Sequence, residues 1–356
     1  MRPSTNVILG FRLATQLTTA MIDPTSSTQF RRLGVLTITA IYLVILAGSI
    51  VRASGAGMGC PDWPTCFGQW IPPTHESQLP ADYHAIYAAR GYANTDFNPL
   101  KTWTEYVNRL LGASAGLLIF LTLLRSRLFL KTDPTIFWLS LAVFLLIGFQ
   151  GWLGSAVVAS NLRPAMITAH MAMAFLIVCL LIYAIARSQH QCLASIDARR
   201  LPERFKSVLI AAMVMTLVQI AMGTQIRESV DFISLAFNHS DRHLWRTDFP
   251  IVFYVHRSFS AVILLTNLWL VWKIVRNIDG GSLFYRFGWI LAGLVLTAIA
   301  SGVTLDRLGF PAFIQPIHLL MANLIFGSQF FLLMIYRYSE KDMRKADLLV
   351  AATRVT

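Results

Sequence analysis

Long runs of apolar residues, separated by short polar segments, dominate the chain. Eight of these runs are long enough to cross a bilayer, which takes about 20 helical residues. They lie near residues 33–52, 104–124, 135–158, 166–186, 207–227, 251–272, 286–305 and 312–336. The runs are continuous and do not alternate with polar residues, which favours helices over the strands of a β-barrel. We therefore predict an all-α integral membrane protein with eight transmembrane helices.

Two short motifs within these runs occur twice. Residues 106–109 (Tyr-Val-Asn-Arg) reappear as residues 254–257 (Tyr-Val-His-Arg), 148 positions later. His170 reappears as His318 at the same spacing, so no net insertion separates the two motifs within either copy. Such a duplication predicts two tandem, pseudo-symmetric four-helix bundles with the same topology.

The repeat extends to the other helices. Residues 48–52 resemble residues 223–227, 175 positions later, and Gly154 matches Gly302. The larger offset makes the first outer loop 27 residues longer than the second. The expected order is a cytoplasmic tail (1–32), an N-terminal bundle (33–187) with a long outer loop (53–103), a cytoplasmic linker (188–206), a C-terminal bundle (207–337) and a second cytoplasmic tail (338–356).

Composition agrees with a membrane location and changes the meaning of the charge. The chain is 55% hydrophobic and 13% charged, which is too apolar for a soluble globular protein. The net charge of +12 comes largely from basic residues in the tails and in alternate loops. An excess of Lys and Arg in short loops marks the cytoplasmic side. We therefore expect both termini in the cytoplasm, a lipid bilayer as the partner surface, and no nucleic-acid partner.

The first 32 residues lack the order of a signal peptide, with a charged start, an apolar run and a small-residue cleavage site. We interpret them as a cytoplasmic tail. A mitochondrial presequence is the alternative, because the stretch contains Ser and Thr and has few acidic residues.

Ionisable residues inside a membrane usually mark a functional site. The repeated positions, residue 108 with His170 in one bundle and His256 with His318 in the other, fall in the first turns at the outer ends of facing helices. Two histidines on facing helices with apolar surroundings are typical of bis-histidine haem ligation. The alternatives are hydrogen-bonded interface histidines, or a structural zinc site, which lacks a clear third and fourth ligand in either bundle.

The two proposed sites differ in their ligands. The C-terminal bundle has His256 and His318, a closed pair that suits an electron-transferring haem b. In the N-terminal bundle Asn108 stands in place of the first histidine, and asparagine is a poor ligand for haem iron. His170 would then be the sole strong ligand there, with an open iron position that suits chemistry.

The N-terminal bundle also has an acid that the other bundle lacks. Glu105 corresponds to Phe253 in the repeat, so we predict a catalytic role for this carboxylate. The alternative is an interfacial carboxylate paired with Arg109, one turn along the same helix. Three further arginines at outer helix ends, Arg52, Arg227 and Arg257, are candidates with Arg109 for haem propionate contacts. Interfacial anchoring is the other interpretation of these arginines.

The long outer loop contains Cys60 and Cys66. The outer side of a bacterial membrane is oxidising, so a disulfide between them is plausible. The second half has no counterpart, which places the pair with the proposed reactive bundle. A structural staple that closes a short loop is the other interpretation.

Together these residues resemble the haem A synthase family, cytochrome oxidase assembly proteins that convert haem O to haem A. The resemblance covers about residues 33–336. It rests on Gly55–Cys60 with Cys66, on Glu105–Arg109, and on His170, His256 and His318. Asn108 departs from the pattern, because many members have a fourth histidine there.

The resemblance implies the following activity and site roles. Haem b would be held by His256 and His318. Haem O would be oxidised in the N-terminal bundle, its methyl group becoming a formyl group by successive hydroxylation and loss of water. Glu105 matches the family's functional glutamate, and Cys60 with Cys66 matches its outer cysteine pair.

The implied partners are haem O and the enzyme that supplies it, the cytochrome oxidase assembly machinery, and an electron donor that the sequence does not name. The implied location is the bacterial cytoplasmic (inner) membrane. Two other functions are compatible with the residues. A non-catalytic haem carrier or oxidase-assembly chaperone would need the ligands without Glu105. A di-haem b protein that takes electrons from quinol would prefer four histidines and fits Asn108 badly.

Overall fold

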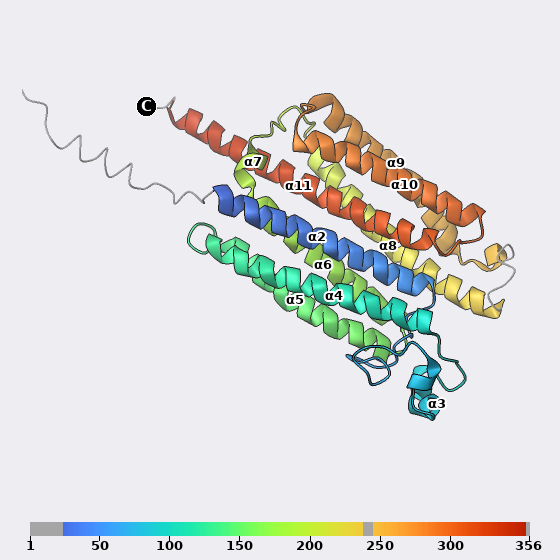
Figure 1. Cartoon of the computed structure of the whole chain (residues 1–356). Helices are drawn as coiled ribbons and strands as arrows, with labels where there is room; N and C mark the ends of the chain where they lie inside the picture. The colour runs from blue at the N-terminus through green and yellow to red at the C-terminus, as the bar shows by residue number, and fades with distance from the viewer. Residues whose placement is uncertain (1–23, 238–244, 354–356) are drawn as a thin grey trace, which may run out of the picture.

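The computed structural model describes residues 24–237 and 245–353 (Figure 1). These residues form helices and loops, and no β-strand occurs within the two described ranges. Residues 1–23 of the predicted N-terminal tail and residues 354–356 lie outside them. The predicted all-α class is therefore confirmed for the described part of the chain.

Eight long helices match the eight predicted membrane segments. They are α2 (Pro24–Ala53), α4 (Pro99–Ser126), α5 (Pro134–Ala159), α6 (Pro164–Ser188), α8 (Phe205–Ala236), α9 (Ile251–Asn277), α10 (Leu283–Arg307) and α11 (Ile314–Thr353). Each has a stretch long and apolar enough to cross a membrane. The prediction of a multi-pass membrane protein with eight such helices is confirmed.

Short helical segments connect the long ones. They are η1 (Glu76–Gln78), α3 (Tyr83–Ile86), η2 (Ala88–Arg90), η3 (Arg127–Phe129), α7 (His190–Ala194) and η4 (Trp245–Asp248). Local sequence explains where several long helices begin. Pro99, Pro134 and Pro164 each occupy the first position of a helix, where a missing N–H breaks no intrahelical bond. Asn98 caps α4 by accepting a hydrogen bond from Lys101 N at 3.0 Å.

Two helices extend well past their predicted apolar runs. α8 continues to Ala236, although its run ends near residue 227, and α11 continues to Thr353. A helix satisfies its own backbone hydrogen bonds in water as well as in lipid, so it does not have to end where the hydrocarbon ends. The segment expected as a tail from residue 338 therefore continues α11 as a helix as far as Thr353.

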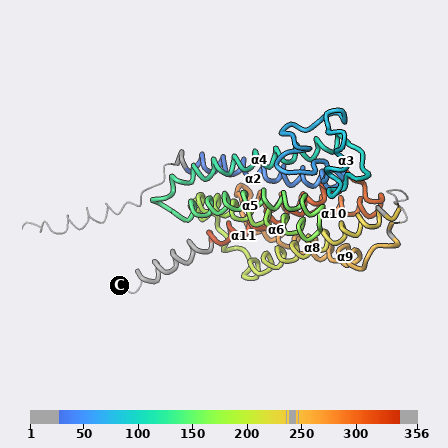
Figure 2. The backbone as a smooth tube through the Cα atoms, turned by 90° about the horizontal axis from the view of Figure 1, so that it is seen from below, coloured from blue at the N-terminus to red at the C-terminus, as the bar shows by residue number. Residues whose placement is uncertain are grey.

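The long helices pack in two groups of four. α2, α4, α5 and α6 contact one another in one group, and α8, α9, α10 and α11 do so in the other. α11 also packs against α2 and α6, and these contacts join the groups, which lie side by side in Figures 1 and 2. Each group has an apolar core of its own, with Ile119 and Leu181 in the first and Leu270 and Leu332 in the second.

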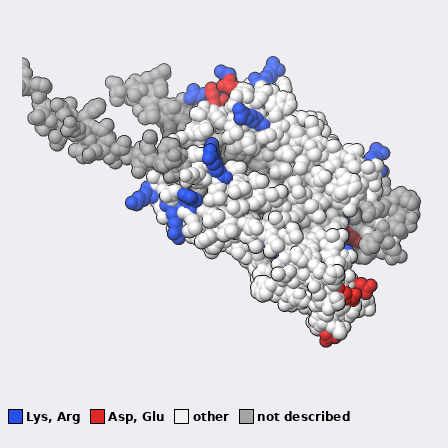
Figure 3. Space-filling view, viewed as in Figure 1, with Lys and Arg blue, Asp and Glu red and all other residues white. Residues whose placement is uncertain are grey.

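Charged side chains gather at the two ends of the molecule (Figure 3). Lys and Arg predominate near the start of α2, acidic residues lie at the opposite end, and a wide uncharged band separates them. An uncharged band around eight apolar helices is what a bilayer requires of the surface it surrounds. The loop between α2 and α4 lies at the end opposite the start of α2 (Figure 1).

Candidate functional site

The structure brings His256 of α9 and His318 of α11 face to face. Their ring centroids lie 6.3 Å apart, with an angle of 61° between the ring planes. Imidazole nitrogens bind metal ions at about 2.0–2.1 Å, so two rings on opposite sides of one ion have their centres roughly 6 Å apart. The observed separation therefore fits two axial ligands of one iron.

Glycines on neighbouring helices make room for both rings. A Cβ added at Gly302 of α10 would lie 3.2 Å from His318 Cε1, and one at Gly223 of α8 would lie 3.7 Å from His256 Cε1. A side chain at Gly302 would displace the imidazole, because Cβ contacts of this length are tighter than ordinary packing.

The N-terminal group repeats the same arrangement. A Cβ at Gly154 of α5 would lie 3.5 Å from His170 Cε1, and one at Gly48 of α2 would lie 3.8 Å from Asn108 Oδ1. All four repeated positions thus rest against a glycine of an adjacent helix. The sequence showed that these glycines repeat, but only the structure shows what each of them contacts.

Polar contacts orient the histidines. His318 Nδ1 lies 3.1 Å from the carbonyl oxygen of Ala298 and 2.9 Å from Ser301 Oγ. A hydrogen bond from Nδ1–H to a backbone carbonyl leaves Nε2 available to a metal, as is usual for ligating histidines. Ser301 was missed by the sequence analysis, although a serine directly before the repeated Gly302 was a signal.

Two glutamines also support the histidine positions. Gln219 Nε2 of α8 donates to His256 O at 2.9 Å, and Gln150 Nε2 of α5 donates to His170 O at 3.0 Å. Each glutamine thereby holds the backbone turn that carries the histidine. The sequence analysis missed both, and the available signal was an isolated amide within an apolar run.

Three of the four repeated positions have buried polar atoms that lack a partner. His170 Nδ1, His256 Nδ1 and Asn108 Oδ1 make no hydrogen bond within the described part of the chain. Buried polar atoms are normally paired, because leaving them unpaired costs stability. Their concentration at the repeated positions is consistent with sites shaped for a bound group.

Protein side chains alone do not complete a metal site in either group. Among the residues that the structure describes, no cluster of three or more His, Cys, Asp or Glu is placed to hold a metal ion. Haem iron needs only axial ligands from the protein, because the macrocycle supplies the others. The pair His256 and His318 therefore fits haem better than a bare metal ion.

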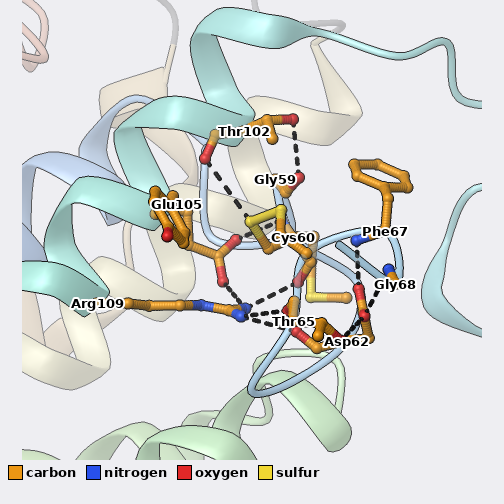
Figure 4. The surroundings of a disulfide bond; sticks show 12 residues. Gly59, Cys60, Asp62, Thr65, Phe67, Gly68, Thr102, Glu105 and Arg109 are labelled. Atoms are coloured by element: carbon orange, nitrogen blue, oxygen red, sulfur yellow. Dashed lines mark hydrogen bonds and ion pairs between the residues drawn. A yellow bond between two sulfur atoms is a disulfide. The ribbon is translucent and has the colours of Figure 1, made fainter. Parts of the chain in front are cut away.

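Glu105 is buried at the outer end of α4, with 4% of its surface exposed. One carboxylate oxygen lies 2.6 Å from Arg109 Nη2, and the other accepts a hydrogen bond from Cys60 N at 2.8 Å (Figure 4). The ion pair with Arg109 is the contact that the alternative interpretation of Glu105 expected. Glu105 thus connects α4 to the cysteine loop.

Arg109 binds the same loop through its backbone. Its guanidinium donates to the carbonyl oxygens of Asp62 at 2.7 Å, Thr65 at 2.9 Å and Cys60 at 3.1 Å (Figure 4). Most of its donors are therefore used within the loop. The structure places Arg109 at the cysteine loop, as a positioning residue beside Glu105.

The loop itself is closed by a disulfide between Cys60 and Cys66, both fully buried (Figure 4). Asp62 accepts hydrogen bonds from Phe67 N at 2.6 Å and Gly68 N at 2.9 Å, and also from the Thr65 hydroxyl. The carboxylate thus turns the chain between the two cysteines.

Aromatic residues cover the disulfide loop. The ring of Phe67 packs edge-on against Tyr83, Tyr87, Tyr92 and Phe97. Burial raises the pKa of Tyr92 above its ordinary value, so the phenol keeps its proton and donates to Met58 O at 2.9 Å. The outer loop is therefore a small packed unit on the end of α4.

Gly59 is expected to tolerate no side chain. A Cβ there would overlap the carbonyl group of Lys101 in α4, and Thr102 Oγ1 holds Gly59 O at 2.9 Å. Gly59→Ala should therefore destabilise the outer loop by about 1–3 kcal/mol, as overpacking usually does. Thermal unfolding of the purified protein measures the effect. Gly112→Ala is the control, because a Cβ at Gly112 meets nothing within 4 Å; equal melting temperatures for the two variants would contradict this account.

The candidate propionate arginines all have protein partners. Arg52 and Arg227 share Asp231, at 3.1 Å and 2.8 Å, one arginine at each carboxylate oxygen. Arg227 also donates to Gln315 at 2.8 Å, and Arg257 lies 3.4 Å from Asp306. Asp231 was missed by the sequence analysis. It joins the ends of α2 and α8, which belong to different helix groups.

Comparisons with known proteins agree with these features. A family model described as cytochrome oxidase assembly protein matches residues 31–330. A protein of Shewanella oneidensis described as "Heme A synthase" is 33% identical over 162 residues, which is 46% of each chain. One of Shouchella clausii with the same description is 32% identical over 39% of each chain. The aligned stretches thus span less than half the length of these two relatives.

A third relative aligns over most of its length. The "Heme A synthase" of Halalkalibacterium halodurans is 22% identical over 320 residues, which is 85% of this chain and 95% of the relative. The match with the family model and this long alignment include both helix groups and all the repeated positions.

Proposed function

Because the chain belongs to the cytochrome oxidase assembly protein family, we propose that it is a haem A synthase, a membrane oxidoreductase that converts haem O to haem A. The names of the relatives support a synthase over a haem carrier or a di-haem electron-transfer protein. The observation that carries the proposal is the repeated geometry, with two facing histidines in one half and His170 with Asn108 in the other.

In this proposal His256 and His318 hold haem b in the C-terminal helix group. Haem b supplies one-electron transfer when it is bound. The residues around the pair fix its position. Ala298 O directs the His318 ring, Gln219 holds the backbone at His256, and the two glycines leave space for the imidazoles.

The substrate, haem O, is proposed to bind in the N-terminal group beside His170. Its methyl group becomes a formyl group by two hydroxylations and the loss of water. Asn108 presents an amide oxygen without a partner in the described chain and does not replace an imidazole, so it leaves one face of the substrate iron open. Glu105, held by Arg109, is proposed to position or transfer protons near that face.

The remaining parts of the proposal concern location and partners. The basic end of the molecule is assigned to the cytoplasm by the positive-inside rule, which puts both termini there and the cysteine loop outside. Cys60 and Cys66 are then on the oxidising side of a bacterial inner membrane, where a disulfide persists. The proposed partners are the enzyme that supplies haem O, the cytochrome oxidase assembly machinery and an electron donor.

Haem analysis tests the proposed activity directly. Membranes that contain haem O, with and without this protein, are extracted and their haems separated by chromatography. Haem A is expected only where the protein is present. Unchanged haem O in both samples would identify a carrier and not a synthase.

Asn108 allows a spectroscopic prediction. Protein loaded with haem in both halves should show a high-spin component from the N-terminal site beside low-spin haem b. Asn108→His should convert that component to low spin, because it restores the second imidazole of the repeat. Asn108→Ala is the control and should leave the spin state nearly unchanged. If the starting protein has low-spin iron only, another residue supplies the missing ligand.

A further inference from the structure

A cleft of about 550 Å³ opens between α6 and α8, which belong to different helix groups. Its walls are the N-terminal part of α6 and the outer part of α8, and the end of α2 closes one side. The lining includes Ala169 and Ala172 on one wall, Ala221 on the other, and Arg52 and Glu228. Arg52 ends α2 on the side of the cysteine loop, so the cleft lies in the outer part of the membrane band.

The cleft exists because the two helix groups meet asymmetrically. The repeat pairs α2 with α8 and α6 with α11, so the contact between α2 and α11 corresponds to that between α8 and α6. α2 and α11 pack tightly, and a Cβ at Gly327 would overlap the Tyr42 hydroxyl. Within the described chain α6 and α8 show no such packing. Small residues that would allow close helix contact therefore face an open space.

Neutral hydrogen-bond acceptors line the cleft. The hydroxyls of Thr168 and Thr224 donate to backbone carbonyls of their own helices, at 2.9 Å and 2.8 Å, so their lone pairs remain for a ligand. Glu228 adds a carboxylate. The cation at the mouth, Arg52, is already paired with Asp231. This lining disfavours the phosphate of a lipid and favours a neutral ligand that donates hydrogen bonds through O–H groups.

The cleft is also next to the proposed haem b site. Ala221 and Thr224 line the cleft, and Gly223 between them contacts the ring of His256 on another side of α8. A ligand in the cleft is thus separated from His256 by the width of one helix backbone.

We propose that this cleft binds a membrane-soluble hydroquinone, with its ring between α6 and α8 and its isoprenoid chain in the bilayer. The hydroxyl groups donate to Thr168, Thr224 and Glu228, and the alanines form an apolar floor for the ring. Binding depends on the cleft alone. The electron transfer described next rests on the proposed function, because it requires haem b at His256 and His318.

The reaction balances with ferric haem as the oxidant. The hydroquinone loses two electrons and two protons and becomes a quinone. The two electrons reduce the haem iron from ferric to ferrous in two successive turnovers. One proton is accepted by the Glu228 carboxylate and the other by water at the outer mouth. The cleft would thereby supply the electron donor that the proposed synthase requires.

Photolabelling tests the binding site. Haem-loaded protein is irradiated with a short-chain quinone that carries an azido group, and the labelled peptides are identified by mass spectrometry. Label is expected in residues 164–172 and 221–228. Ala221→Phe fills the cleft and should lower this labelling about tenfold or more. Ala113→Phe makes the same change at an exposed alanine of α4 and should leave it unchanged.

Further measurements keep the test decisive. An unchanged haem b spectrum shows that a variant is folded, and Ala172→Phe on the opposite wall replaces Ala221→Phe if that protein does not fold. Label elsewhere, equal label in all variants, or label that added phospholipid displaces as well as added quinone does would overturn the proposal.

Haem reduction tests the role of Glu228. In stopped-flow absorbance, a short-chain hydroquinone should reduce haem b about tenfold or more slowly in Glu228→Gln, since the proton acceptor is lost. Reduction by dithionite should be unchanged, and Glu203→Gln, on an inner loop, should behave as the starting protein. Equal rates in both glutamine variants would contradict the role of Glu228. Haem A formation together with unaffected cleft variants would reject this inference alone, and absence of haem A in all samples would reject the proposed function.

Discussion

Replacing His256 or His318 with Ala is expected to abolish the low-spin b-type spectrum of the purified protein. The rings are 6.3 Å apart, and each rests against a glycine that leaves no neighbouring side chain to take over. Loss even of groups that only orient a ligand typically weakens metal binding about 10–100-fold, so loss of a ligand itself should weaken haem binding at least about 100-fold. Absorbance spectra and haem content per protein measure the effect.

His190→Ala is the matched control. His190 lies on α7, is exposed, and contacts Arg187 O at 3.0 Å, far from the paired histidines in the chain. Its substitution should leave haem content and spectrum unchanged. If both ligand variants keep the low-spin spectrum, haem b is held elsewhere and the division of roles between the two halves is wrong.

Glu105→Gln is expected to retain haem b and to lower haem A formation about 100-fold or more, within the range of a lost general acid–base group. Glutamine keeps the size of the side chain and an oxygen that accepts from Cys60 N, but it loses the charge that pairs with Arg109. Haem extraction and chromatography measure haem A, and a hydroxylated form of haem O should accumulate.

A second variant separates chemistry from anchoring. Thr102→Val removes the hydrogen bond from Thr102 to Gly59 O, which holds the same loop, and leaves Glu105 and Arg109 in place. Near-normal haem A from Thr102→Val supports a chemical role for the carboxylate. Equal losses in both variants, together with equal falls in melting temperature, would show that Glu105 acts by holding the cysteine loop.

The helices were predictable because the cause is local. A bilayer requires about 20 apolar residues with internally satisfied backbone bonds, so composition alone located eight segments. The ends were less predictable. α11 continues to Thr353 and α8 to Ala236, since a helix in water is limited by its own capping and packing and not by hydropathy.

The repeated positions were predictable for a similar reason. A constant offset of 148 residues marks His170 with His318 and residue 108 with His256, and the structure rests each of them against a glycine. Contacts between distant parts of the chain were not. Cys60 N reaches Glu105 across 45 residues, and Asp231 bridges Arg52 and Arg227 from different helix groups.

The sequence by itself therefore determined the membrane class, the eight helices, the repeat and the residues that break it, because each depends on periodicity or spacing along the chain. Tertiary structure alone decided that Glu105 and Arg109 hold the cysteine loop, and that α6 and α8 leave a cleft where α2 and α11 close. The physical reason is that contact between helices depends on the shapes of both surfaces. A repeat in one dimension does not specify how two similar but unequal halves pack together.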